Sequence, residues 1–102
     1  MQLGGQFYTR RLNLPDTTGR IYIEEGSGAQ LGTAQLTAGS VTVANSGLTA
    51  NSRIFLSVQS LGTVSSPKAV AVAIKTPGSN FVIQSSDNTD TSTVAWWIVE
   101  AT

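Results

Sequence analysis

Short extended segments recur along this chain, and their spacing constrains the fold more than any other feature of the sequence. Segments rich in valine, isoleucine and threonine alternate with clusters of glycine, serine, asparagine and aspartate. No stretch of about 11 residues or more sustains a helical period. The pattern predicts seven strands, at residues 20–25, 33–37, 40–44, 53–59, 68–75, 80–84 and 93–100.

Two of the connections are short enough to be tight turns. Ala38 and Gly39 stand between two alternating runs, and Gly39 can supply the positive φ that such a turn requires. In the second connection, Pro77 fixes its own φ and Gly78 suits a type II turn. Short strands joined by turns predict an all-β fold, a single antiparallel β-sandwich or barrel of jelly-roll type. The residues leave the choice between an open sandwich and a closed barrel undecided.

Residues 1–19 differ from the rest and are expected to form an extended arm ahead of the β domain, residues 20–102. They show no steady alternation and contain paired glycines. Their apolar side chains are too many for a free linker: Leu3, Phe7, Tyr8, Leu12 and Leu14. We therefore expect the arm to lie against a neighbouring subunit or a larger scaffold, with a disordered tail as the alternative.

The strand at 53–59 alternates cleanly, so its two faces can be assigned from the sequence. Its core face is predicted to carry Ile54, Leu56 and Val58. Its other face, with Phe55, Ser57 and Gln59, reads as mostly solvated.

The last predicted strand carries both tryptophans of the chain side by side. Trp96 and Trp97 must point to opposite faces, because side chains alternate along a strand. Their neighbours are apolar too, so both faces of residues 94–99 need a covering layer. One layer is the core of the domain itself. The other comes either from the same chain or from a partner subunit.

A row of alanines marks another face where a close neighbour is expected. Within residues 68–75 the large side chains of Val70, Val72 and Ile74 share one face. The opposite face is uniformly small, which lets another backbone approach closely. The sandwich could curl and cover these surfaces itself, but a domain of 102 residues rarely covers two strands on both sides, which favours a subunit interface. The candidate interface residues are Ala69, Ala71, Ala73, Trp96 and Trp97.

Charge is scarce and balanced, which limits the kinds of partner. Charged residues form 12% of the chain, with six basic and six acidic side chains and no histidine. Nucleic acid is not an expected partner, because phosphate binding needs a basic surplus. A small domain with so little charge tends to associate, and self-association is the simplest form. No membrane contact is expected either, since the longest apolar runs, 69–74 and 94–99, are far shorter than the roughly 20 residues a span requires.

The sequence offers little for catalysis. Without histidine and cysteine it cannot form a Ser–His or Cys–His nucleophile, or an imidazole or thiolate metal site. The remaining acids and bases are six scattered carboxylates: Asp16, Glu24, Glu25, Asp87, Asp90 and Glu100. The loop around Asp87 and Asp90 lacks the spacing of a calcium-binding loop, and its polar side chains suit backbone capping. We expect no catalytic residue, no metal site and no cofactor.

Two runs of the chain resemble the small β domain found in many tailed-bacteriophage virion proteins. They are GTAQLTAGSVTVANSGLTANSRIFLSVQSLGT and SNFVIQSSDNTDTSTVAWWIVE. The matching elements are the Gly-Thr-Ala opening, the Asn-Ser-Arg-Ile start of a strand and the Asp-Thr-Ser approach to a terminal strand with tryptophan. The segment RIYIEEGSGA extends the likeness, so that it covers roughly residues 20–100 and leaves out the arm.

The resemblance implies a structural role in a virion. In that family the domain occurs as stand-alone head decoration or head-fibre proteins and at the ends of longer fibres, and it is expected to form homotrimers without catalysis. Because the sequence starts at Met1 and has no long shaft, we expect a capsid decoration (cement) protein on the outer capsid surface, with the major capsid protein as partner. The arm would then supply the candidate capsid contacts, Phe7, Tyr8, Arg10, Arg11 and Leu12.

The alternative is a fibre-tip or receptor-binding domain that recognises carbohydrate on the host surface. Aromatic rings stack on sugars, so an exposed Trp96 or Trp97 would favour this function.

Overall fold

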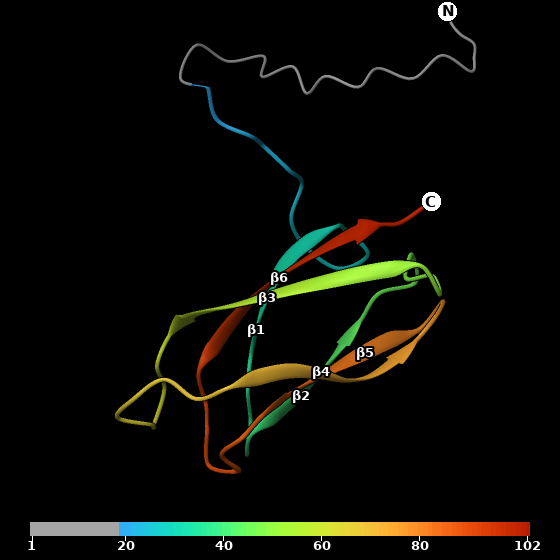
Figure 1. Ribbon diagram of the computed structural model, residues 1–102. Helices are drawn as coiled ribbons and strands as arrows, with labels where there is room; N and C mark the ends of the chain where they lie inside the picture. The colour runs from blue at the N-terminus through green and yellow to red at the C-terminus, as the bar shows by residue number, and fades with distance from the viewer. Residues whose placement is uncertain (1–18) are drawn as a thin grey trace, which may run out of the picture.

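The computed structural model describes residues 19–102, which form an antiparallel β-sandwich of two three-stranded sheets (Figure 1). The strands are β1 (Leu31–Gln35), β2 (Ser40–Ala44), β3 (Ser52–Ser60), β4 (Val70–Thr76), β5 (Asn80–Ser85) and β6 (Thr93–Glu100). Sheet A has the order β1-β6-β3 and sheet B the order β2-β5-β4. The prediction of an all-β, antiparallel fold is confirmed. Residues 19–102 contain no helix that could cross a membrane.

Six of the seven predicted strands are present. Those at 40–44 and 93–100 match the prediction, and the bounds of the other four differ by at most two residues. The predicted strand at 20–25 is wrong, because of these residues only Glu25 makes a bridge, an isolated one to Leu31. A strand needs a neighbour to pair with, and this segment leads away from the sandwich instead (Figure 1).

The turn at Ala38 and Gly39 forms as predicted, but it joins two sheets instead of two paired strands. Both residues have positive φ, 51° and 83°. Thr37 and Ser40 exchange backbone hydrogen bonds across them. Beyond this pair the chain separates, because β1 belongs to sheet A and β2 to sheet B. The expected hairpin is therefore a corner of the sandwich.

The second predicted turn joins a true hairpin. Strands β4 and β5 pair along their length. Gly78 has a φ of 77°, and Ser79 N donates to the carbonyl of Thr76 over 3.0 Å. Pro77 and Gly78 thus occupy the positions that a type II turn gives them.

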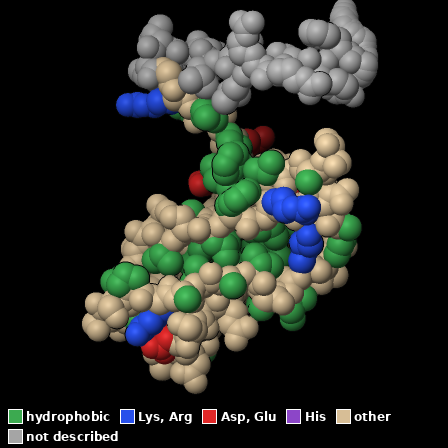
Figure 2. Space-filling model, in the orientation of Figure 1, with side chains coloured by type: hydrophobic (Ala, Val, Ile, Leu, Met, Phe, Trp, Pro, Cys, Tyr) green, Lys and Arg blue, Asp and Glu red, His purple; other side chains and the backbone are tan. Residues whose placement is uncertain are grey.

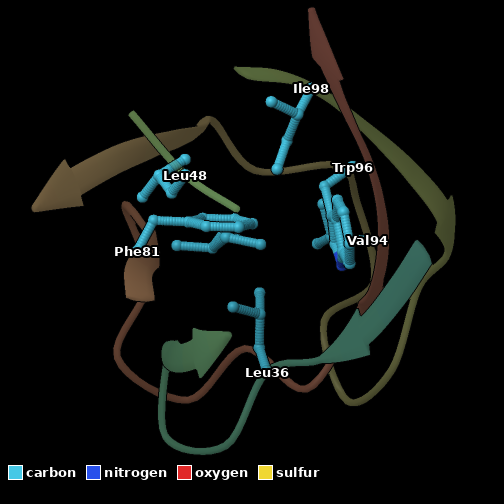
Figure 3. Packing of buried hydrophobic residues seen from close by; sticks show 7 residues of the cluster. Leu36, Leu48, Phe81, Val94, Trp96 and Ile98 are labelled. Atoms are coloured by element: carbon cyan, nitrogen blue, oxygen red, sulfur yellow. The ribbon is translucent and has the colours of Figure 1, made fainter. Parts of the chain in front are cut away.

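The core lies between the two sheets and includes residues from both (Figure 3). Its fully enclosed members are Leu36, Leu48, Phe81, Ile83, Val94, Trp96 and Ile98. Phe81 and Trp96 meet edge to face, with ring centroids 5.5 Å apart and planes at 79°. Ile54, Leu56 and Val58 pack against this cluster from β3, as the alternation of that strand predicts.

Gly32 on β1 makes room for the indole of Trp96. A Cβ atom at position 32 would lie 2.4 Å from Cζ2 and 2.8 Å from Cε2 of that ring. The two residues are register partners on neighbouring strands. Only glycine leaves room for the large ring this close to the β1 backbone.

Candidate interaction surface

The two neighbouring tryptophans lie on opposite sides of sheet A. Trp96 is enclosed in the core of the chain, with 2% of its surface exposed. Trp97 lies on the outer face and is 44% exposed. Of the two predicted interface tryptophans, Trp97 is thus the one that a partner can contact.

Trp97 stands in the middle of an apolar row that crosses sheet A. Its neighbours across the strands are Leu31 on β1 and Phe55 on β3. The rings of Phe55 and Trp97 are tilted by 42° with centroids 6.0 Å apart, yet Phe55 remains 57% exposed. Val99, the next outward residue on β6, is 37% exposed. We call these four residues, Leu31, Phe55, Trp97 and Val99, the aromatic face.

Within sheet A, the surroundings of the aromatic face are almost free of charge. Its one charged neighbour in the sheet is Arg53, which is paired with Val99 across the strands and lies two residues before Phe55. Arg53 Nη1 donates to the carbonyl of Asn51 over 3.2 Å. On the other side of Trp97, the register pairs Ala95 with uncharged Ser57 and Thr33. Arg53 therefore places one positive charge at the edge of this apolar surface.

The alanine row lies on the outer face of sheet B. Ala69, Ala71 and Ala73 are all exposed and line a shallow hollow of about 330 Å³ together with residues 84–86. No described residue covers them. A close contact between this row and another backbone would need a partner chain. The contact that the sequence predicts here therefore stays a prediction.

Ile74 departs from the face predicted for it. A bulge shifts the register of β4 between Val72 and Ile74. As a result Ile74 is 58% exposed, whereas Val70 and Val72 pack against the core as predicted. The bulge reverses the alternation of the strand after Val72, so that Ile74 joins the outer face.

An opening between β1 and β2 reaches the buried indole. This hollow of about 380 Å³ is lined by residues of both strands, by the segment 25–27 and by Trp96. The indole Nε1 of Trp96 is buried and donates to no atom of residues 19–102. A buried donor is normally satisfied, and the hollow beside it is large enough for water.

Asp90, a candidate acid in the sequence, links the end of β5 to the residue before β6. Its side chain is buried and accepts hydrogen bonds from Ser92 Oγ (2.5 Å), Ser92 N (2.8 Å) and Ser85 Oγ (2.7 Å). These bonds, the one from the Ser92 hydroxyl foremost, hold the pKa of Asp90 below its usual value although burial opposes them. A carboxylate with its oxygens occupied in this way is a structural anchor and a poor general base.

Glu100 has a similar role at the end of β6. Thr49 Oγ1 and Ser52 Oγ each donate to one of its carboxylate oxygens over 2.5 Å. The bond from Ser52, followed by that from Thr49, lowers the pKa of Glu100, and the charge of Lys75 adds to the effect. Lys75 Nζ in turn donates to the carbonyl of Ser52 over 2.9 Å. These contacts hold the start of β3 beside the end of β6.

The described carboxylates do not converge on a reaction centre. Asp87 accepts a hydrogen bond from the hydroxyl of Thr89, and its other carboxylate oxygen lies 3.9 Å from the ammonium of Lys68. Glu24 and Glu25 are exposed in the segment before β1. Residues 19–102 hold no group of three or more potential metal ligands. The predicted capsid contacts, Phe7, Tyr8, Arg10, Arg11 and Leu12, lie outside the described residues.

Sequence reasoning missed three members of the aromatic face. The alternation of β3 placed Phe55 outward, as observed, but gave it no role. Leu31 lies before the predicted start of its strand, and Val99 shares the predicted face of Trp97 but is not among the predicted interface residues. What unites them is the register of three strands around Trp97, and that register cannot be read from any single segment.

Comparison with known proteins relates most of this domain to one family. The matching family model is described as "K1 capsule-specific polysaccharide lyase, C-terminal domain", and it matches residues 28–99. A comparison with curated proteins gives no match. The family match agrees with the resemblance to phage structural β domains and carries nothing specific to head decoration. Since it spans more than half of the 102 residues, the chain belongs to the family of this lyase C-terminal domain.

Proposed function

We propose that the chain is a structural protein of a bacteriophage virion, which assembles as a homotrimer and decorates the outer surface of the capsid. The observation that carries the proposal is the aromatic face, which leaves two large aromatic rings open to solvent on one sheet. Membership in a family named for the C-terminal domain of a capsule-specific lyase supports a virion protein. In this proposal the domain binds and performs no catalysis.

Contacts between copies would cover the aromatic face. Full burial of a phenylalanine or another large apolar side chain contributes about 1.5–3 kcal/mol, and a buried aromatic anchor can dominate an interface. A trimer repeats each such contact once per copy. Low charge favours the same outcome, because the chain has no net repulsion to keep copies apart.

Attachment to a capsid would then add a second contact. We assign it to the arm, residues 1–19, whose aromatic and basic side chains suit a protein surface. Three arms on one trimer bind together, which raises the overall affinity without new contacts. A protein that binds the assembled shell and not its dissociated subunits stabilises the shell. The direct test is deletion of residues 1–14, which should abolish binding to capsids and leave the oligomer folded.

The first experiment is the native mass by light scattering across a dilution series. A trimer has a mass of about 32 kDa, three times the 10.7 kDa chain. Trp97→Ser should shift the mass toward the monomer. The matched control is Leu61→Ser, which removes an exposed apolar side chain from the loop after β3. A wild-type protein that stays at 10.7 kDa would refute the assembly, and equal effects of the two substitutions would refute the role of the aromatic face.

Carbohydrate recognition at a fibre tip is the second candidate. It is favoured by the exposed pair of Phe55 and Trp97, whose rings could stack on sugars, and by the polysaccharide in the family description. Fluorescence separates the two candidates. Emission that iodide quenches in the assembled protein, and that glycans protect, would support recognition of sugars. Emission from Trp97 that becomes shielded on assembly alone supports the structural role.

A further inference from the structure

The segment just before β1 has the sequence of a strand but no strand to pair with. Within residues 19–102, no backbone hydrogen bond joins residues 21–24 to another segment. Ile21 and Tyr22 are 56% and 68% exposed. The segment rises from the sandwich (Figure 1), and Figure 2 shows apolar side chains gathered on it outside the body of the domain. We call residues 21–25 the extension.

The side chains of the extension complement the aromatic face of sheet A. Tyr22 and Glu24 are two residues apart, so in an extended chain they point to the same side. Phe55 and Arg53 on β3 are likewise two residues apart on the outer side of their strand. One side of the extension therefore carries an aromatic ring and a carboxylate, and the outer side of β3 carries an aromatic ring and a guanidinium that can contact them.

Within residues 19–102, the charged side chains of these two surfaces form no ion pair. The one ion pair within residues 19–102 is that of Lys68 and Asp87. Neither Glu24 nor Arg53 takes part in it. The extension leads away from its own sandwich (Figure 1), so it is free to reach the Arg53 of another copy.

We propose that the extension of one copy lies across the aromatic face of the next copy, with Tyr22 against Phe55 and Trp97 and with Glu24 beside Arg53. The inference rests on the proposed self-assembly and names the segment that makes it. The contact covers the exposed rings of one copy and the exposed Tyr22 of the other in a single step.

Engineered disulfides test the contact directly, because the chain has no cysteine of its own. Tyr22→Cys combined with Phe55→Cys should give covalently linked chains on oxidation, seen as dimer and higher bands without reductant. Both positions are exposed, so the variant should fold. The matched control keeps Tyr22→Cys and moves the second cysteine to Asn88, an exposed position in the loop between β5 and β6.

The outcomes separate this inference from the proposed assembly. Stronger linkage through position 55 than through position 88 supports the inference. Equal or absent linkage in a protein whose native mass is that of a trimer overturns the inference and leaves the assembly standing. A native mass of one chain at every concentration refutes both.

A charge exchange gives a second, independent readout. Glu24→Arg and Arg53→Glu should each weaken assembly about two- to fivefold, the range of an exposed ion pair. The double exchange should restore it. Glu25→Arg is the control, because its side chain points to the other side of the extension. Additive losses in the double variant would contradict the pairing of Glu24 with Arg53.

Discussion

A single methyl group at Gly32 tests how the buried tryptophan is packed. In Gly32→Ala the new Cβ would lie 2.4 Å from Cζ2, 2.8 Å from Cε2 and 3.1 Å from Cη2 of Trp96. Carbon atoms in favourable contact are about 3.5–4.0 Å apart, so the ring or the β1 backbone must move by roughly 1 Å. The ring has little room to move, because it is 2% exposed and meets Phe81 edge to face.

The size of the effect follows from two opposing contributions. Overpacking a filled core costs about 1–3 kcal/mol. Gly32 does not have the positive φ that disfavours other residues, so restricting the unfolded chain offsets about 0.4–1 kcal/mol. The free energy of unfolding should therefore fall by about 1–2 kcal/mol, a measurable part of the roughly 5–15 kcal/mol typical of a domain.

Urea unfolding monitored by tryptophan fluorescence measures this loss. Gly47→Ala is the control, since its Cβ would lie 3.4 Å from the nearest atom, Asn45 Oδ1, and it should change stability by less than about 0.5 kcal/mol. In a Trp96→Phe background, which removes most of the clash and leaves Trp97 as the reporter, Gly32→Ala should cost much less. Equal losses in both backgrounds would show that the indole does not lie over Gly32.

Three further perturbations have outcomes set by the same structure. Hydrogen bonds lower the pKa of Asp90 and Glu100 in the folded chain, so these two carboxylates stabilise the fold above their unfolded pKa values of about 4, and the stabilisation is lost as the pH falls through their folded pKa values. A urea midpoint unchanged from about pH 6 to pH 2 would contradict this. Gly62→Ala should destabilise more than Gly32→Ala, because its Cβ would lie 2.0 Å from Thr91 Oγ1 and 2.4 Å from the Thr91 carbonyl oxygen, and thermal unfolding against wild type measures it. Ala71→Leu should leave the isolated domain within about 0.5 kcal/mol of wild type, since Ala71 is exposed; a loss of about 1–3 kcal/mol confined to the oligomer would reveal a close contact on the alanine row.

Local chemistry explains which parts of the fold the sequence predicts. The turn at Pro77 and Gly78 depends on the φ preferences of those two residues alone, and it forms where expected. The placement of Trp96 and Trp97 on opposite faces follows from simple alternation along β6, whereas the burial of Trp96 and not Trp97 depends on where the other sheet lies. In both cases the cause lies within a few residues of the effect.

The errors arise where distant segments decide the outcome. Residues 20–25 have strand propensity but no neighbouring edge within the described chain, so propensity alone gave the wrong result. Ile74 is displaced by a bulge that depends on the pairing of β4 with β5. The candidate surface depends likewise on register, because Leu31 and Phe55 become neighbours of Trp97 only when three strands align.

The place of β6 in sheet A determines the order in which the sheet can be built. It is the last strand in the sequence, yet it lies between β1 and β3 and pairs with both. During synthesis, β1 and β3 are made before the strand that joins them exists. Sheet A can therefore close only after the ribosome has passed Glu100, whereas the hairpin of β4 and β5 can form earlier. Long-range pairing of this kind slows folding and leaves strand edges open in the meantime. A nascent chain released before β6 would expose the inner sides of β1 and β3 and become a substrate for chaperones and proteases.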